Sequence, residues 1–300
     1  MYKIVQILFI TVLIWYLFSG FNIKNIDMSL FSYIGVILTF FSLLISQMIL
    51  SLRWMVMSNL SFGSSFEVIT ISSALNMILP ARLGEISKAY YLKKFYDYNY
   101  NKTFSLIFVE RFFDIIALFF IMCYWLYNFF SDTQIKNATI FLAFFIVIIL
   151  VLFNTKKFYY FLKKIPFKFL RVYLQKLYRN IYRLLKSPYE ALFFTFLVWF
   201  LYFLSYFLFF TFGANFNLSH YKMLELFIFS TIALSVPILP AGIGTFEGAI
   251  VFFLTTQGVD KETAFVSAVI YHALIFIVDF LLFFIILLYK DIYFKDLIKR

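Results

Sequence analysis

The residues of this chain best suited to chemistry are charged side chains inside long apolar stretches. Glu110, Arg111 and Asp114 fall within about one helical turn of the apolar segment 103–127. At helical spacing Glu110 and Asp114 share a face, and Arg111 reaches Asp114 at i,i+3. Ionisable groups at membrane depth are costly and usually mark a functional site. A cluster that neutralises itself and only fastens helices together is the alternative interpretation.

Proline and glycine break two other apolar regions, roughly 66–95 and 222–257. Proline removes a backbone donor and clashes with the preceding turn, and glycine loosens the backbone. We therefore predict that neither region is one straight helix. The breaks fall at Pro80, Gly84, Pro237, Pro240, Gly242 and Gly244.

Polar residues beside these breaks are candidate contacts for a substrate. Arg82 lies where a half-helix is expected to begin, and a helix N-terminus together with a guanidinium suits a phosphate. Snorkelling of Arg82 to the surface, or a pair with Glu85, is the alternative. Glu85 and Glu247 follow the two breaks, where a carboxylate can bind an ammonium group, carry a proton or hold a hairpin closed. A structural pair with Arg82 or Arg111 is the other interpretation of both. Asn76 precedes the first break and is expected to satisfy freed backbone groups.

A histidine and an aspartate complete the candidate site residues. His272 and Asp279 are seven residues apart in the apolar segment 263–289, so they lie near one helix face. Because histidine titrates near neutral pH, a proton relay is one interpretation, and a hydrogen-bonded structural histidine is the other.

The composition places these residues in a membrane. Apolar residues make up 64% of the chain and charged residues only 14%, unlike a soluble domain. Tyrosine and tryptophan, including Trp15, Trp54, Trp125 and Trp199, are expected in belts at the membrane surface. The lone Cys123 excludes an internal disulfide, and no Cys/His spacing suits a metal, so no cofactor is expected. Six stretches are long enough to cross a bilayer: roughly 4–20, 31–55, 103–127, 138–153, 189–212 and 263–289.

Basic residues between these spans predict their orientation. The net charge is +11, and the segment 154–188 holds ten Lys or Arg and no acidic residue. The positive-inside rule places this segment and both termini in the cytoplasm, in a multi-pass protein of the cytoplasmic (inner) membrane. The same pattern argues against nucleic acid as a partner. We interpret 154–188 as an amphipathic segment on the inner leaflet, which either anchors the protein or recruits anionic lipid.

The two broken regions resemble each other. Residues 78–84 (ILPARLG) align with residues 238–244 (ILPAGIG), and the loop charges make the two regions hairpins that enter from opposite faces. We therefore predict an all-α integral membrane protein, a helical bundle with inverted repeats and two re-entrant helical hairpins. The chain is expected to be one transmembrane domain, 1–300. Its repeats span about 31–127 and 189–289, joined by a cytoplasmic linker at about 154–188.

The segments 76–85 (NMILPARLGE), 110–114 (ERFFD) and 239–247 (LPAGIGTFE) resemble the signatures of a known family. They are similar to the flippase-like transmembrane domain of lysylphosphatidylglycerol synthases, over nearly the whole chain. The resemblance implies a domain that flips aminoacylated phospholipid. The family's last motif usually has an arginine where this chain has His272. The soluble aminoacyl-transferase domain is expected to be absent, which makes this a stand-alone member.

These observations predict a transporter rather than an enzyme. The expected substrate is an anionic phospholipid, an aminoacylated lipid or a polyprenyl-linked lipid, moved between leaflets by alternating access at the hairpin tips. A transporter of a small anion or ion is one alternative. A scaffold for a glycosyltransferase or a lipid-modifying enzyme is the other. Membrane lipids are the expected partners, and assembly into a homo-oligomer is left open.

Overall fold

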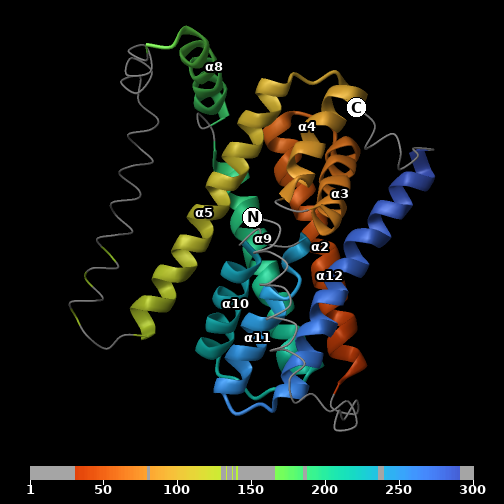
Figure 1. Ribbon diagram of the computed structural model, residues 1–300, viewed down its shortest axis with the longest axis vertical. Coiled ribbons are helices and arrows are strands. Elements are labelled where there is room, and N and C mark those ends of the chain that lie inside the picture. The colour runs from red at the N-terminus through yellow and green to blue at the C-terminus, as the bar shows by residue number, and fades with distance from the viewer. Residues whose placement is uncertain are drawn as a thin grey trace, which may run out of the picture. The chain divides into compact units, whose positions relative to one another are not determined.

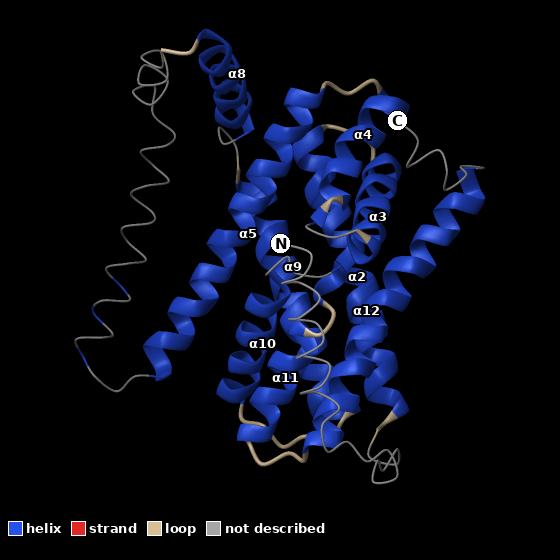
Figure 2. Cartoon of the chain, in the orientation of Figure 1, coloured by secondary structure: helices blue, strands red, loops and turns tan. Residues whose placement is uncertain are grey.

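A computed structural model of the chain describes residues 31–79, 82–129, 166–184, 188–235 and 240–290, with isolated positions at 133, 137 and 140. Every regular element among these residues is a helix (Figure 2). In chain order the helices are α2 (Tyr33–Ser58), α3 (Phe62–Ile78), α4 (Gly84–Tyr96), α5 (Tyr100–Phe129), α8 (Lys168–Leu184), α9 (Tyr189–Phe207), the π-helix η4 (Leu208–Gly213), α10 (His220–Ser235), the 3₁₀-helix η5 (Pro240–Gly242), α11 (Thr245–Thr256) and α12 (Lys261–Lys290). The prediction of an all-α chain is thus confirmed for the described residues.

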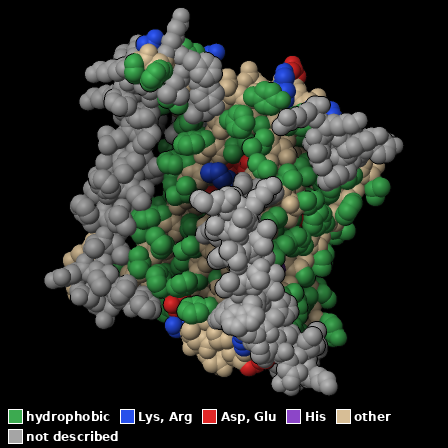
Figure 3. All heavy atoms as spheres, viewed as in Figure 1, with side chains coloured by type: hydrophobic (Ala, Val, Ile, Leu, Met, Phe, Trp, Pro, Cys, Tyr) green, Lys and Arg blue, Asp and Glu red, His purple; other side chains and the backbone are tan. Residues whose placement is uncertain are grey.

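Three helices are long and apolar enough to cross a membrane: Tyr33–Ser58, Tyr189–Gly213 and Lys261–Tyr289. They correspond to the predicted spans 31–55, 189–212 and 263–289. The predicted span 103–127 is a continuous helix, α5, which is not one of these three. The predicted spans 4–20 and 138–153 lie outside the described residues. Hydrophobic side chains cover much of the described surface in one view (Figure 3), as expected where lipid is the solvent.

The described residues form two compact units. Unit 1 holds those of Met1–Met48, Ile69–Ser87 and Phe200–Arg300, and unit 2 holds those of Ile49–Val68 and Lys88–Trp199. In unit 1, α10 packs on α11 and α11 packs on α12 (Figure 1). In unit 2, the amphipathic helix α8 packs on α5 and covers the described part of the predicted amphipathic segment 154–188.

Aromatic residues fill the core of unit 1. Tyr206 and Tyr271 are buried with their ring centroids 4.5 Å apart. A buried phenol needs a hydrogen-bond partner, and each has one: Ser230 Oγ lies 2.8 Å from the Tyr206 hydroxyl, and Ser205 Oγ lies 2.6 Å from that of Tyr271. Serines on neighbouring helices thus satisfy the polar ends of an otherwise apolar core.

Both predicted breaks separate two helices. The first falls between α3 and α4, and the second between α10 and α11, with η5 inside it. The aligned residues Arg82 and Gly242 both adopt left-handed backbone, with φ of 55° and 71°. Among the predicted break residues, Pro80 and Pro237 lie outside the described residues, whereas Pro240 begins η5 and Gly244 caps α11.

A hydroxyl closes each break across the same number of residues. Ser72 Oγ donates to the carbonyl of Gly84 at 3.0 Å, and Thr245 Oγ1 donates to the carbonyl of Ala233 at 3.4 Å, twelve residues away in both cases. Gly84 leaves no room for a side chain, because a Cβ there would run into the Ser72 carbonyl and the Asn76 amide. The helices on either side of the first break therefore approach at backbone contact.

Candidate functional site

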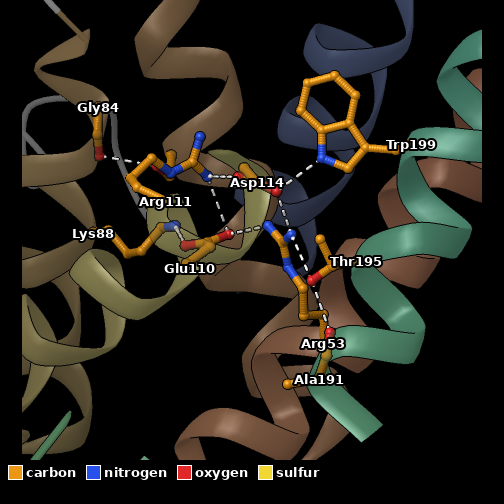
Figure 4. A network of polar contacts seen from close by, with 10 residues as sticks. Arg53, Gly84, Lys88, Glu110, Arg111, Asp114, Ala191, Thr195 and Trp199 are labelled. Atoms are coloured by element: carbon orange, nitrogen blue, oxygen red, sulfur yellow. Dashed lines mark hydrogen bonds and ion pairs between the residues drawn. The ribbon is translucent and has the colours of Figure 1, made fainter. Parts of the chain in front are cut away.

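A buried arginine on α2 organises the polar centre of unit 2. Arg53 is only 1% exposed and lies opposite two carboxylates of α5 (Figure 4). Its Nη2 donates to Glu110 Oε1 at 2.7 Å, and its Nη1 donates to Asp114 Oδ1 at 2.6 Å. The two carboxylates are four residues apart on one face of α5, so one planar guanidinium can bind both.

Two further cations complete this group. Lys88 of α4 is buried, donates to Glu110 Oε2 at 2.9 Å, and lies 4.5 Å from the ring centroid of Trp54. Arg111 contacts Glu110 at 3.3 Å and Asp114 at 3.2 Å, and its side chain is 37% exposed. We call Arg53, Lys88, Glu110, Arg111 and Asp114 the charge cluster.

Residues of α9 support the charge cluster from another side. Thr195 Oγ1 lies 3.4 Å from Arg53 Nη1, and it also donates to the carbonyl of Ala191 at 2.7 Å. Trp199 Nε1 donates to Asp114 Oδ1 at 3.2 Å. Asp114 therefore accepts hydrogen bonds from Arg53 and Trp199 and forms an ion pair with Arg111, which together compensate for its partial burial.

The charge cluster is not neutral. It contains three cations and two carboxylates, so its formal charge is 3 − 2 = +1. Arg53 and Lys88, both nearly inaccessible, balance the two carboxylates. Arg111 is the most exposed of the three cations. An anion that reached Arg111 would neutralise the charge cluster without disturbing its buried pairs.

The sequence predicted part of this group. The expected neighbourhood of Glu110, Arg111 and Asp114, including the Arg111–Asp114 pair at i,i+3, is confirmed. Arg53 and Lys88 were missed. Arg53 lies inside the predicted span 31–55, and a charge within an apolar span was the signal that could have found it.

Two of the tryptophans contact the charge cluster. Trp54 is 1% exposed and lies beneath Lys88, and Trp199 donates a hydrogen bond to Asp114. The ring of Trp54 is thus buried inside the protein rather than in a surface belt, whereas the belt position of Trp199 stays a prediction. Trp15 lies outside the described residues.

Unit 1 has its own buried carboxylates with different partners. Glu247 Oε1 lies 2.6 Å from His272 Nδ1, and its Oε2 accepts a hydrogen bond from the Gly244 N–H at 2.7 Å. The partner of Glu247 is thus a histidine rather than the arginine considered as an alternative. Asp279 accepts a hydrogen bond from Gln47 Nε2 at 2.5 Å. His272 and Asp279 lie on one helix, as predicted, but have different partners.

The remaining predicted site residues lie around the first break. Arg82 is exposed, and Glu85 is half-buried in the first turn of α4. Asn76 is half-buried, and its amide faces Gly84. Its Oδ1 has no hydrogen-bond partner among the described residues, so its expected role of satisfying freed backbone groups is not seen there for that atom. Among the residues that the structure describes, no group of three or more His, Cys, Asp or Glu side chains could hold a metal ion.

Comparison with known proteins gives this arrangement a family. A family model for the lysylphosphatidylglycerol synthase TM region matches residues 3–282. The UPF0104 membrane protein MJ1078 of Methanocaldococcus jannaschii is 26% identical over 210 residues, which cover 66% of this chain and 86% of that protein. No solved structure matches the chain. Because the family model covers nearly all residues, this chain is a membrane protein that belongs to the family of the lysylphosphatidylglycerol synthase transmembrane region.

Proposed function

We infer that this chain moves a lipid with an anionic headgroup between the leaflets of its membrane. The observation that carries the proposal is the charge cluster, in which buried pairs hold a surplus positive charge at a partly exposed arginine. A buried carboxylate or ammonium is expensive in apolar surroundings unless it is paired. Placing five charged side chains in one largely buried group carries a large desolvation cost, and a role in binding would explain why the protein keeps them.

Arg111 is the residue proposed to meet the headgroup. A guanidinium offers five N–H donors in a plane that matches the oxygens of a phosphate. Arg111 shares only long contacts of 3.3 Å and 3.2 Å with its carboxylates, and 37% of its side chain is exposed. Glu110 and Asp114 hold it in place and keep the local charge low enough for the headgroup to leave again.

The transport experiment measures flipping of a headgroup-labelled anionic phospholipid in vesicles that contain the full chain. Arg111→Gln removes the surplus charge and is expected to slow flipping about tenfold or more, because a charge-assisted hydrogen bond contributes about 1.5–3 kcal/mol. Arg171→Gln on α8 is the matched control, because it removes the same charge outside the charge cluster and should flip lipid at the wild-type rate.

The outcomes separate the alternatives. A small-anion transporter would take up a soluble labelled anion into the same vesicles and leave the lipid in place. A scaffold for another membrane enzyme would flip nothing above empty vesicles. Equal flipping by wild type and Arg111→Gln would refute the assignment of the headgroup to the charge cluster.

The proposed mechanism also needs the two breaks to reach membrane depth from opposite faces, as in transporters with inverted repeats. The shared left-handed backbone at Arg82 and Gly242 supports a common origin of the two breaks. Single cysteines at positions 82 and 241, in a Cys123→Ser background, are expected to react with a membrane-impermeant thiol reagent added from opposite sides. Reaction of both from the same side would contradict the inverted arrangement.

A further inference from the structure

A second basic site lies in unit 2, at the start of α5. A cavity of 390 Å³ is lined by Asn99, Asn101, Lys102, Lys176, Arg179 and Asn180. Asn99 directly precedes α5, Asn101 and Lys102 lie in its first turn, and the last three residues come from α8. We call this the α5–α8 pocket. Lys102 precedes Glu110 by eight residues, or about 12 Å along the helix, so the pocket is distinct from the charge cluster.

The charges of the α5–α8 pocket are not compensated. Its lining has three cations, three amides and no carboxylate. None of Lys102, Lys176 and Arg179 forms an ion pair within the described part of the chain, in contrast to the surface pair of Lys93 with Asp97. Lys102 instead lies 4.3 Å from the ring centroid of Tyr98. Three positive charges around one small cavity favour an anion.

The walls of the pocket are held in place by packing and hydrogen bonds. Helix α8 packs on α5, with Tyr178 8% exposed and Asn180 Nδ2 lying 3.4 Å from Ser105 Oγ. Asn99 Oδ1 accepts the backbone N–H of Asn101 at 2.9 Å. Lys176 and Arg179 are three residues apart on α8 and therefore share a face. The cations converge because two packed helices present them, not because a loop happens to carry them.

The size and surroundings of the pocket indicate the ligand. At 390 Å³ the cavity lies near the lower end of small-molecule sites, which suits a polar headgroup rather than a whole lipid. Exposed Tyr100, Phe104 and Phe108 form an apolar stripe on α5, at i, i+4 and i+8. Beside α8, Phe167 is 71% exposed, and Figure 3 shows hydrophobic and basic side chains together over this helix. Exposed apolar side chains on α5 and next to α8 suit contact with acyl chains.

We propose that the α5–α8 pocket binds a phosphate group carried on a polar headgroup. Lys102, Lys176 and Arg179 contact the phosphate oxygens, and the amides of Asn99, Asn101 and Asn180 bind hydroxyl or ester oxygens of the headgroup. The phosphate comes either from an anionic lipid or from a soluble phosphate ester, and the exposed apolar side chains on α5 and next to α8 favour the lipid.

Binding is measured on the full chain in neutral detergent with two probes, a fluorescent phosphatidylglycerol and inorganic phosphate as its competitor. The double substitution Lys102→Gln and Arg179→Gln is expected to weaken binding of the lipid about tenfold or more, since each basic residue near anionic lipid is worth about a fivefold change. Arg171→Gln, which removes one charge from the same helix outside the pocket, is expected to change affinity less than Arg179→Gln alone. Retention of helical content and of a single size-exclusion peak shows that each variant is folded.

Each outcome decides the proposal. Loss of binding in the pocket variants, with Arg171→Gln less affected, supports the pocket. Displacement of the lipid only by millimolar phosphate assigns the site to a lipid headgroup, whereas equal affinity for both probes assigns it to a soluble phosphate compound. Equal weakening by Arg171→Gln and Arg179→Gln shows diffuse attraction to the helix surface and overturns the proposal, as does unchanged binding in the double variant. Because no transport is measured, the result stands apart from that of the flipping experiment.

Discussion

Replacing Arg53 by methionine tests whether the charge cluster is held together from α2. The substitution keeps much of the apolar side-chain volume but removes the guanidinium that bridges Glu110 and Asp114. Glu110 retains Lys88 at 2.9 Å, and Asp114 retains Arg111 at 3.2 Å. The remaining cluster has two positive and two negative charges. The loss of stability in this variant therefore measures the broken contacts rather than an uncompensated net charge.

The size of the expected stability loss follows from the burial of the ion pairs that Arg53 forms. Removal of one partner from a buried ion pair costs about 3–5 kcal/mol. Because both carboxylates of the cluster keep a second cation, we expect the Arg53→Met variant to lose about 3 kcal/mol, at the lower end of that range. For a chain of this size the loss corresponds to a fall of about 6 °C in Tm, at about 2 °C per kcal/mol. Arg111→Gln should cost less than about 1 kcal/mol, because a partly exposed pair contributes little.

The assay is thermal unfolding of the full chain in detergent, read as the fraction that remains in a monodisperse size-exclusion peak after heating. The expected order of Tm is wild type and Arg171→Gln highest, Arg111→Gln slightly lower, and Arg53→Met lowest. Should Arg53→Met unfold at the wild-type temperature, or Arg111→Gln be the less stable of the two, the buried bridge described for Arg53 would be wrong.

Two further predictions concern residues outside the charge cluster. Gly84→Ala should lower stability by about 1–3 kcal/mol, because its Cβ would meet the immobile carbonyl of Ser72. The control Gly63→Ala, with nothing within 4 Å of the new Cβ, should be neutral or slightly stabilising. Equal Tm values for the two variants would contradict the close approach at Gly84. Burial opposes ionisation of Asp260. Hydrogen bonds from Thr263 and from the backbone N–H of Glu262 outweigh this effect and lower the pKa of the Asp260 carboxyl. The stabilisation by Asp260 is therefore present above the ordinary aspartate pKa and lost as the pH falls through the lower folded value. Asp260→Ala should accordingly cost about 1 kcal/mol at neutral pH and less in acid, and a difference in Tm that persisted in acid would argue against the cap.

The sequence predicted those features whose signal is local. Proline and clustered glycines disfavour a continuous helix, so the second break was found at Pro240, Gly242 and Gly244. Long apolar runs predicted α2, α9 and α12 to within a few residues, because length and composition suffice for a span. The contact of Arg111 with Asp114 was also predictable, since both lie on one helix at a fixed spacing.

The partners across helices could not be read in the same way. Arg53 is 57 residues from Glu110 in the chain, and Glu247 is 25 residues from His272. Which buried charge meets which depends on how helices pack, and no local pattern records that packing. Lys88 shows the consequence: it lies in the predicted broken region 66–95, and only its burial against Trp54 and its contact with Glu110 make it part of the charge cluster.

The two units stabilise their buried carboxylates with different partners. A carboxylate buried among apolar helices needs a donor. In unit 2 the donors are the side chains of arginine and lysine. In unit 1 the partners are the amide of Gln47 and the imidazole of His272. His272 is also the position where the family's motif usually has an arginine. At this position the chain therefore presents an imidazole to Glu247 in place of a guanidinium, so the two units satisfy their buried carboxylates with different side-chain groups.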